Sequence, residues 1–227
     1  SGGYVPFEAF FIYEDSVFAS VLSDFVQLFN TFDLDDFCSY PNAFNSLINF
    51  FKELCSHQIR LLCNQFPADF LKGLMAMIFE CSIRGITMLN EASRGSIVII
   101  TNIVKFIFEE QHTKEAEILV DAINGEDLGR ANACLWEVVF NSSNNSEVNL
   151  VGEPIKYFIM INEEAFGVIR EKILEIAEKY ADPEIQRSLE IFEKGIEDAV
   201  DSESGMIILL NQLKRSVNQK VVSVSIL

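Results

Sequence analysis

PADFLKGLMAMIFECSIRGITMLNEASRGSIVIITNIVKFIF, from Pro67 to Phe108, contains two consecutive apolar segments with helical periodicity. In the first, apolar residues recur every three or four positions from Phe70 to Phe79, and polar residues take the opposite side. The second, from Ile97 to Phe108, is apolar on almost every side, and its only interruptions are Thr101, Asn102 and Lys105. A helix of this kind must be covered from both sides, which predicts a central helix between two layers with Ile100, Val104 and Ile107 among the most buried residues.

The segments before this stretch are also periodic. Residues 17–32 carry an apolar residue at every third or fourth position, which predicts a helix. Three aspartates between positions 33 and 36 are expected to end that helix. Pro41 is expected to open the next one, because a first-turn residue needs no N–H donor. This second helix is predicted to continue through Cys63 until Pro67 ends it.

More helices are predicted after the stretch. In residues 113–123 the side chains expected to face the core are Ala116, Leu119, Val120 and Ile123. A helix from 126 to 140 contains the only tryptophan, Trp136, whose spacing from Leu135 and Val139 favours a core position over an interface anchor. Residues 141–146 form the most loop-like segment, and Pro154 precedes the next apolar run. The last three helices are expected at 164–180, 183–200 and 202–219.

All of these segments are helical and their connections are short, so neighbours in sequence are expected to pack as antiparallel pairs. Helix pairs recur at roughly forty residues, a period typical of HEAT-like arrays. The sequence therefore predicts an all-α, HEAT-like domain over residues 14–219, with a possible sub-boundary at 141–146. Residues 1–13 are interpreted as a cloning scar followed by an apolar lead-in, and residues 220–227 as a tail.

The composition restricts the kinds of partner. The formal net charge is −17 and the isoelectric point is about 4.4, so nucleic acid and anionic membrane surfaces would both repel the chain. Basic proteins are the natural partners, although the acidic residues could also serve only to dissolve a chain that is 49% hydrophobic. No apolar run reaches the length of a membrane span. Sixteen of the twenty phenylalanines precede residue 109, so the first half is built mainly for burial.

No catalytic or metal-binding constellation is evident. None of the five cysteines belongs to a C-x-x-C pair, and they are interpreted as small core residues of a reducing compartment. The only histidines, His57 and His112, lack a nucleophile with an orienting third group, and no cofactor is expected. Adjacent carboxylates diverge on a helix, so solvated faces are favoured over acid–base pairs. The chain is therefore not expected to be an enzyme.

Acidic residues on two sides of the 113–123 helix form the candidate binding site. Two of them end the central helix and the others flank the turn at Asn124 and Gly125, about 15 Å away by the helical rise. Two acidic clusters at this spacing could hold an extended basic peptide. The proposed cargo-binding residues are Glu109, Glu110, Asp121, Glu126 and Asp127.

Between Asn45 and Glu110 the chain resembles the C-terminal HEAT repeats of the importin-β (karyopherin) superfamily, most closely its transportin-SR branch. The resemblance covers about a third of the chain. It rests on four stretches, which are FFKELC (50–55), NQFPADFL (64–71), MIFECSIRGI (77–86) and SIVIITNIVKFIFE (96–109).

This resemblance implies a right-handed solenoid of antiparallel helix pairs that carries protein cargo through nuclear pores. The chain would then be the C-terminal fragment of a longer receptor that shuttles between cytoplasm and nucleus. Ran GTPase would act mainly on the rest of the parent chain, and this part would bind cargo with basic or arginine-rich segments. The alternative hypothesis is a helical adaptor or regulatory domain that binds an amphipathic helix in a groove floored by phenylalanines.

Overall fold

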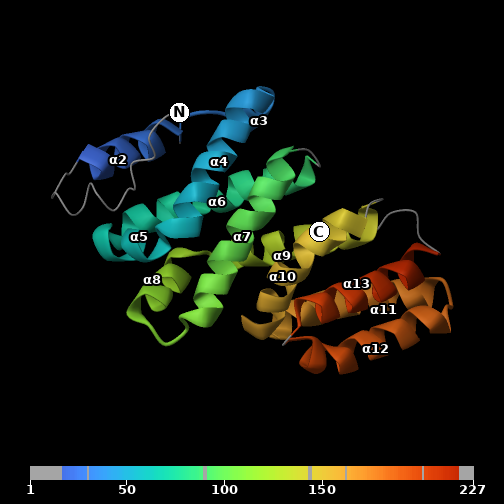
Figure 1. Ribbon diagram of the computed structural model, residues 1–227. Helices are drawn as coiled ribbons and strands as arrows, with labels where there is room; N and C mark the ends of the chain where they lie inside the picture. The colour runs from blue at the N-terminus through green and yellow to red at the C-terminus, as the bar shows by residue number, and fades with distance from the viewer. Residues whose placement is uncertain are drawn as a thin grey trace.

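The computed structural model describes residues 17–29, 31–88, 91–142, 145–161, 163–200 and 202–219. Over these residues every regular element is an α-helix and no strand is present (Figure 1). The prediction of an all-α fold is confirmed at this level. The predicted lead-in at 1–13 and the tail at 220–227 lie outside the described residues.

Within these ranges the chain forms helices of very different lengths. The short ones are α3 (Leu34–Cys38), α5 (Ile59–Gln65) and α8 (Lys114–Ala122). The others are α2 (Val17–Phe29), α4 (Pro41–His57), α6 (Ala68–Thr87), α7 (Glu91–Glu109), α9 (Gly125–Asn141), α10 (Asn145–Ile161), α11 (Glu163–Lys179), α12 (Pro183–Val200) and α13 (Glu203–Asn218).

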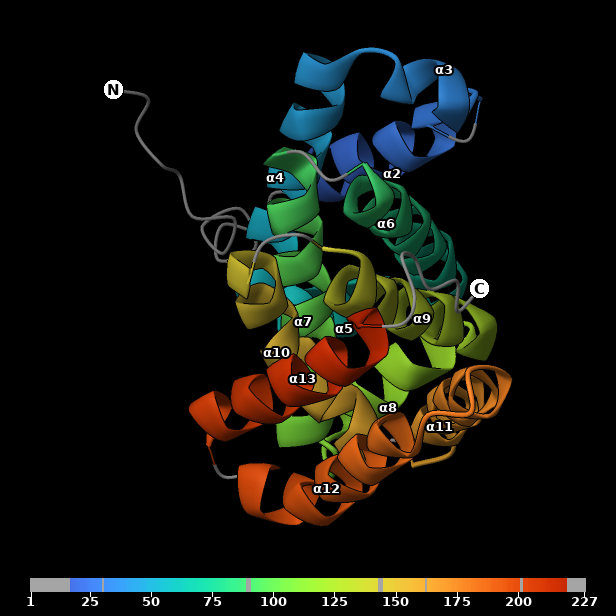
Figure 2. The same cartoon turned by 90° about the vertical axis from the view of Figure 1, so that its right-hand side faces the viewer.

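The helices pack in two rows. In one row α4, α7, α10 and α13 contact each other in that order, and they cross Figure 1 from its blue to its red end. In the other row α2, α6, α9 and α11 contact each other in order, and the pairs α6–α7 and α9–α10 join the rows. Figure 2 shows α2 and α3 at one end of the molecule and α12 at the other. The helices of the first row begin at residues 41, 91, 145 and 203. This spacing is longer than the predicted repeat of roughly forty residues, because two helices lie between successive members of the row.

α7 is the central helix, as predicted. It contacts α4, α6, α8 and α10, and Ile100, Val104 and Ile107 are all buried. Two glycines let its neighbours approach closely. A β-carbon on Gly95 would lie 2.5 Å from Cγ2 of Ile48 on α4, and one on Gly85 of α6 would collide with the hydroxyl of Ser96.

Trp136 is a core residue, which confirms the prediction. Its side chain is fully buried, and its ring centroid lies 5.7–5.9 Å from those of Phe140, Phe166 and Phe192. These rings come from α9, α11 and α12, so the aromatic cluster joins three helices of the C-terminal half. Aromatic pairs at this separation add stability beyond the area they bury.

α13 holds the end of α9 with two polar side chains. Lys214 donates from Nζ to the carbonyl oxygen of Ser142 at 2.7 Å, and Asn218 donates from Nδ2 to that of Phe140 at 2.7 Å. The last carbonyls of a helix have no partner within it, so these bonds satisfy groups that would otherwise be buried and unpaired. Burial lowers the pKa of Lys214, and nearby Glu147 partly opposes that shift.

Three sequence predictions in the first half of the chain were wrong. The helix from Pro41 does not continue to Cys63, because Gln58 leaves helical geometry with φ −124° and ψ 5°. The break turns α5 so that Ile59 and Leu62 reach the core. The helix predicted at 17–32 ends at Phe29, and the aspartates thought only to terminate it begin α3, where the Asp33 side chain accepts a hydrogen bond from the Asp35 N–H.

Two further corrections concern α8 and α10. Val120 was expected in the core but is 45% exposed, because α8 buries only the side that carries Ala116 and Leu119. α10 already begins at Asn145, inside the predicted loop, and Pro154 lies within it. Packing of α10 against α7, α9 and α13 outweighs the hydrogen bond that proline cannot donate.

The position of α7 can be tested with a matched pair of substitutions. Val104→Asp places a carboxylate where no water reaches, so it should lower the free energy of unfolding by about 3 kcal/mol or more. Val98 lies on the same helix but is 37% exposed, so Val98→Asp should lower the free energy of unfolding by about 1 kcal/mol or less. Chemical denaturation followed by circular dichroism measures both. Equal losses would show that α7 is not packed as described.

Candidate functional site

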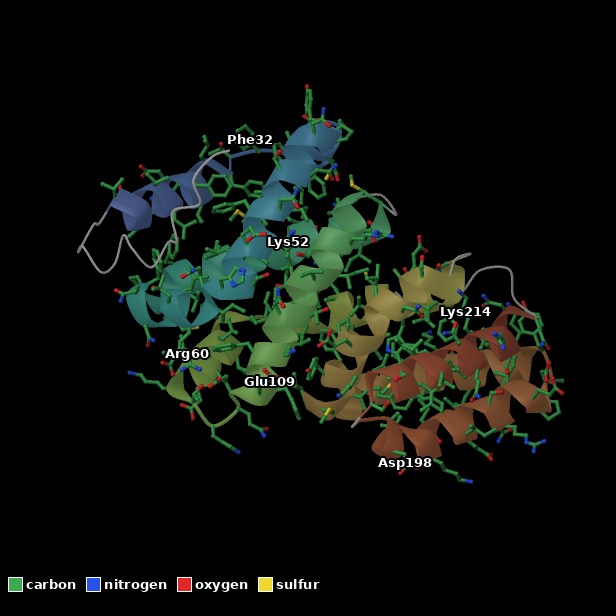
Figure 3. The ribbon with its side chains drawn as sticks, in the orientation of Figure 1. Phe32, Lys52, Arg60, Glu109, Asp198 and Lys214 are labelled. Carbon is green, nitrogen blue, oxygen red and sulfur yellow. The ribbon has the colours of Figure 1, made fainter. Side chains whose placement is uncertain are left out.

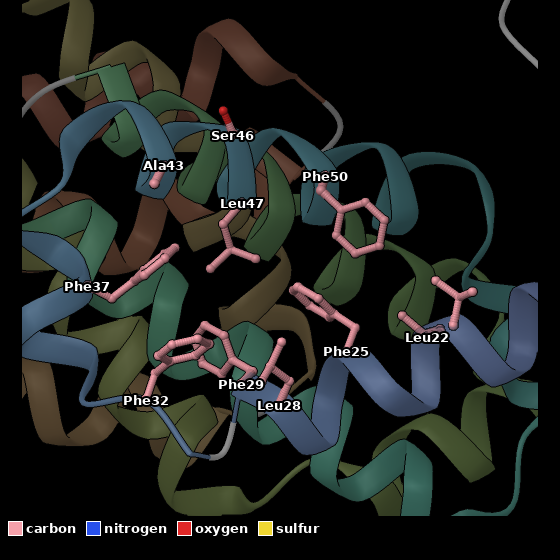
Figure 4. A pocket seen from close by; sticks show the side chains of 11 residues that line it. Leu22, Phe25, Leu28, Phe29, Phe32, Phe37, Ala43, Ser46, Leu47 and Phe50 are labelled. Atoms are coloured by element: carbon pink, nitrogen blue, oxygen red, sulfur yellow. The ribbon is translucent and has the colours of Figure 1, made fainter.

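A groove of about 480 Å³ opens between α2 and α4, and we call it the α2–α4 groove. Figure 4 shows Phe25 and Phe29 of α2 facing Leu47 and Phe50 of α4 across it. Its lining is apolar except for one serine. The residues that line it are Val21, Leu22, Phe25, Leu28, Phe29, Phe32, Phe37, Ala43, Ser46, Leu47 and Phe50.

The groove exists because α2 is apolar on two sides. Leu22 and Val26 are buried, and α2 packs against α6. Val21 and Leu28 belong to the other side and remain 58% and 56% exposed. One set of contacts attaches α2 to the core, and the second apolar side is left facing solvent at the groove.

Aromatic rings join the walls at both ends of the groove. Near one end the ring centroids of Phe25 and Phe50 lie 5.6 Å apart in an edge-to-face arrangement. Near the other end the ring centroid of Phe37 on α3 lies 6.1 Å from that of Phe29 and 6.3 Å from that of Phe32. These contacts brace the walls, so the groove is preformed, and Phe32 is still 52% exposed.

An apolar surface of this kind is typical of a protein-binding site. Contiguous exposed apolar patches mark interaction surfaces, and apolar grooves between helices accept amphipathic helices. The sequence predicts a phenylalanine-floored groove only as an alternative and identifies none of the residues that line it. The signal was present in residues 17–32, whose apolar positions exceed what one buried stripe requires.

Two of the acidic residues nominated from the sequence lie at the end of α7 and after it. Glu110 pairs with Arg60 at 2.7 Å, and Glu109 lies 3.9 Å from Lys105. Lys105 also pairs with Glu153 at 3.4 Å. Figure 3 shows Arg60 and Glu109 near the C-terminal end of α7, well away from Phe32. Both carboxylates are therefore partly neutralised within the chain.

Of the other three nominated acids, Asp121 lies in the last turn of α8, and Glu126 and Asp127 lie in the first turn of α9. Asp127 is 3.5 Å from Arg130, which also pairs with Glu80 at 2.9 Å, and burial is the main cause that raises the pKa of Asp127. Asp121 and Glu126 are exposed and form no ion pair with any described residue. Glu109 and Glu110 precede α8, whereas Asp121 is near its end and Glu126 and Asp127 follow it, so the five acids form two groups at the two ends of α8.

A smaller hollow of about 370 Å³ lies where α7 meets α8. It includes Val120 and Asp121 on α8 and Ile107 on α7. Among the described residues, Asp121 is thus the one nominated acid that lines a hollow beside an exposed apolar side chain, that of Val120. The hollow places the exposed side chain of Val120 beside two carboxylates, those of Glu117 and Asp121.

The cysteines are placed as core residues. Cys55, Cys63, Cys81 and Cys134 are buried, and Cys38 is half-buried. Burial raises the pKa of Cys55 to about 12 and those of Cys63 and Cys134 to about 11, and it also raises the pKa of Cys81. A thiol that stays protonated is a poor nucleophile. Over the described residues no three histidine, cysteine or acidic side chains are grouped so as to hold a metal ion.

Comparison of the chain with family models, with curated proteins and with solved structures finds no match. In the part of the chain that the structure describes, no helix has the length and apolar character to cross a membrane.

Thiol labelling tests the placement of the cysteines. With a chromogenic disulfide reagent at mildly alkaline pH, the native protein should expose about one reactive thiol, that of Cys38, and the unfolded protein all five. A Cys38→Ser variant should show almost no native labelling. Fast labelling of two or more thiols in this variant would contradict the described core.

Proposed function

We propose that this chain is a non-catalytic protein-interaction module, and that its α2–α4 groove receives an amphipathic helix from a partner protein. One observation carries the proposal. A preformed groove, lined almost entirely by aliphatic and aromatic side chains, leaves Val21, Leu28 and Phe32 more than half exposed. Burying such side chains is favourable by about 25 cal/mol for each Å² of apolar surface removed from water.

A helix fits this groove better than an extended strand. Strand addition needs a free sheet edge, and the described residues contain no sheet. A helical ligand satisfies its own backbone hydrogen bonds and presents side chains at i, i+4 and i+7 along one side. Those side chains can enter between the rings of α2 and α4 without leaving polar backbone groups buried.

Peptide binding tests the groove. A fluorescent amphipathic peptide with a leucine stripe and equal numbers of lysine and glutamate should bind, and a scrambled peptide of identical composition should not. Val21→Lys and Leu28→Lys should each weaken binding at least about tenfold, because each places a charge in the apolar contact. Fluorescence anisotropy measures the affinities.

Ile208→Lys is the matched control, because Ile208 is 57% exposed on α13, far from the groove. It should leave peptide affinity unchanged. All three substitutions are at exposed sites, so each should change stability by no more than about 0.5 kcal/mol. Equal binding of the patterned and scrambled peptides would contradict the proposal, as would equal losses in all three variants.

A second candidate function is that of a C-terminal fragment of a nucleocytoplasmic transport receptor. The two rows of contacting helices and the net charge of −17 favour it, because stacked helix pairs with acidic surfaces suit extended basic cargo. In this proposal the rows form a right-handed HEAT-like solenoid. The parent protein shuttles between cytoplasm and nucleus, and Ran acts on segments beyond this chain.

Charge reversal tests the second candidate. Replacing Glu109, Glu110, Glu126 and Asp127 by lysine should abolish binding of an arginine-rich peptide while circular dichroism stays unchanged, because each exposed pair contributes only about 0.5 kcal/mol. Wild-type affinity for the peptide should fall steeply between about 0.1 M and about 1 M salt. Unchanged binding by the quadruple variant would move the cargo site to the acidic helices after Glu163 or leave the charge a role in solubility alone.

A further inference from the structure

We propose that the partner helix of the α2–α4 groove is basic, with about three turns and with lysine or arginine beside its apolar stripe. This inference rests on the proposed groove function and adds the charge and length of the ligand. It follows from the charged residues around the groove rather than from its apolar lining.

One acidic residue lies beside the exposed wall of α2. Asp24 follows Val21 by three residues and precedes Leu28 by four, so it shares their side of the helix. Its side chain is exposed and forms no ion pair within the described part of the chain. A ligand helix that covers Val21 and Leu28 therefore passes next to this carboxylate.

Two more acids lie at the end of the groove formed by Phe32 and Phe37. Asp33 is adjacent to Phe32 and caps α3, where it accepts the N–H of Asp35 at 2.9 Å. Asp36 is adjacent to Phe37. Both side chains are exposed, and neither pairs with a cation over the residues that the structure describes.

Two cations on helices that border the groove or pack against α2 pair with other acids. Arg84 pairs with Asp35 at 3.0 Å and with Glu80 at 3.3 Å, and Lys52 lies 3.6 Å from Glu53. Asp24, Asp33 and Asp36 lie around an apolar groove and form no ion pair with the residues that the structure describes. Complementary charge at the rim of an interface guides encounter and selects the partner, so this rim favours a cationic helix.

The same charges disfavour two occupants from the chain itself. A second copy would bring a surface with a net charge of −17 against an acidic rim. The N-terminal segment 1–16 contains Glu8, Glu14 and Asp15 and no lysine or arginine. Each of these occupants would place like charges together, whereas a basic partner neutralises the rim.

The groove also limits the length of the ligand. Its lining positions on α2 extend from Val21 to Phe29, about 12 Å along the helix axis, and Phe32 extends it further. A helix of about eleven residues, or three turns, matches that span. Its apolar anchors would lie at i, i+4 and i+7, with basic residues on both flanks of the stripe.

Two peptides with the same leucine stripe test the charge. One carries lysine at its polar positions and the other carries glutamate. At low salt the lysine peptide should bind the full chain about tenfold or more tightly than the glutamate peptide, and the ratio should approach one at high salt. Isothermal titration calorimetry and anisotropy measure the two affinities.

Substitutions that remove negative charge show which acidic residues cause the preference for the lysine peptide. The triple variant Asp24→Asn, Asp33→Asn and Asp36→Asn should remove most of the preference for lysine, and asparagine at position 33 still caps α3. The matched control replaces three exposed acids outside the groove and outside the nominated cargo site, Asp69→Asn, Glu190→Gln and Asp198→Asn, and should keep the preference. Loss of the preference in both variants would show a general charge effect and overturn the inference.

The possible outcomes distinguish a failure of the basic-partner inference from a failure of the proposed groove function. If both peptides bind equally and Leu28→Lys abolishes both, the groove function stands and the basic partner is wrong. If neither peptide binds, the groove function fails. If deletion of residues 1–13 raises affinity for both peptides alike, that segment is the occupant, and the inference of an outside basic partner is overturned. Dimerisation that Leu28→Lys abolishes would overturn it in favour of a second copy.

Discussion

The structure depends on the burial of α7 between the two rows of helices. α7 contacts α4 and α10 within its row and α6 across to the other, so its removal would leave three helices without their main apolar contact. Gly95 and Gly85 permit that close packing, because any side chain larger than hydrogen would collide with Ile48 or Ser96. Interior packing is as dense as in organic crystals, so such close approaches fix the positions of the neighbouring helices as well.

The groove forms because the core buries only part of the apolar surface of α2. α2 buries Leu22 and Val26 as it packs against α6, while Val21, Phe25, Leu28 and Phe29 line the groove that it shares with α4. The rings of Phe25 and Phe37 brace the two walls, which keeps the space from collapsing. A groove that exists before its ligand arrives lowers the ordering cost of binding.

The acidic character of the chain divides into two physical roles. Glu80 and Asp127 pair with Arg130, and Arg84 links Glu80 to Asp35, so these groups connect α3, α6 and α9 at the surface. Such exposed pairs contribute little each and matter mainly as a set. Acids that form no ion pair with the described residues, such as Asp24 and Asp36 beside the groove, are the ones able to select a ligand by charge.

The sequence by itself determined the helical class and most of the core, because a 3.6-residue period is a local property that survives in any helical packing. It placed Val104 and Trp136 correctly for that reason. Only the tertiary structure decided the break at Gln58, the helical position of Pro154 and the exposure of Val120, since each depends on which distant helix covers a given side. The groove is of the same kind: α2 shows two apolar sides in the sequence, but packing against α6 decides which of them stays open.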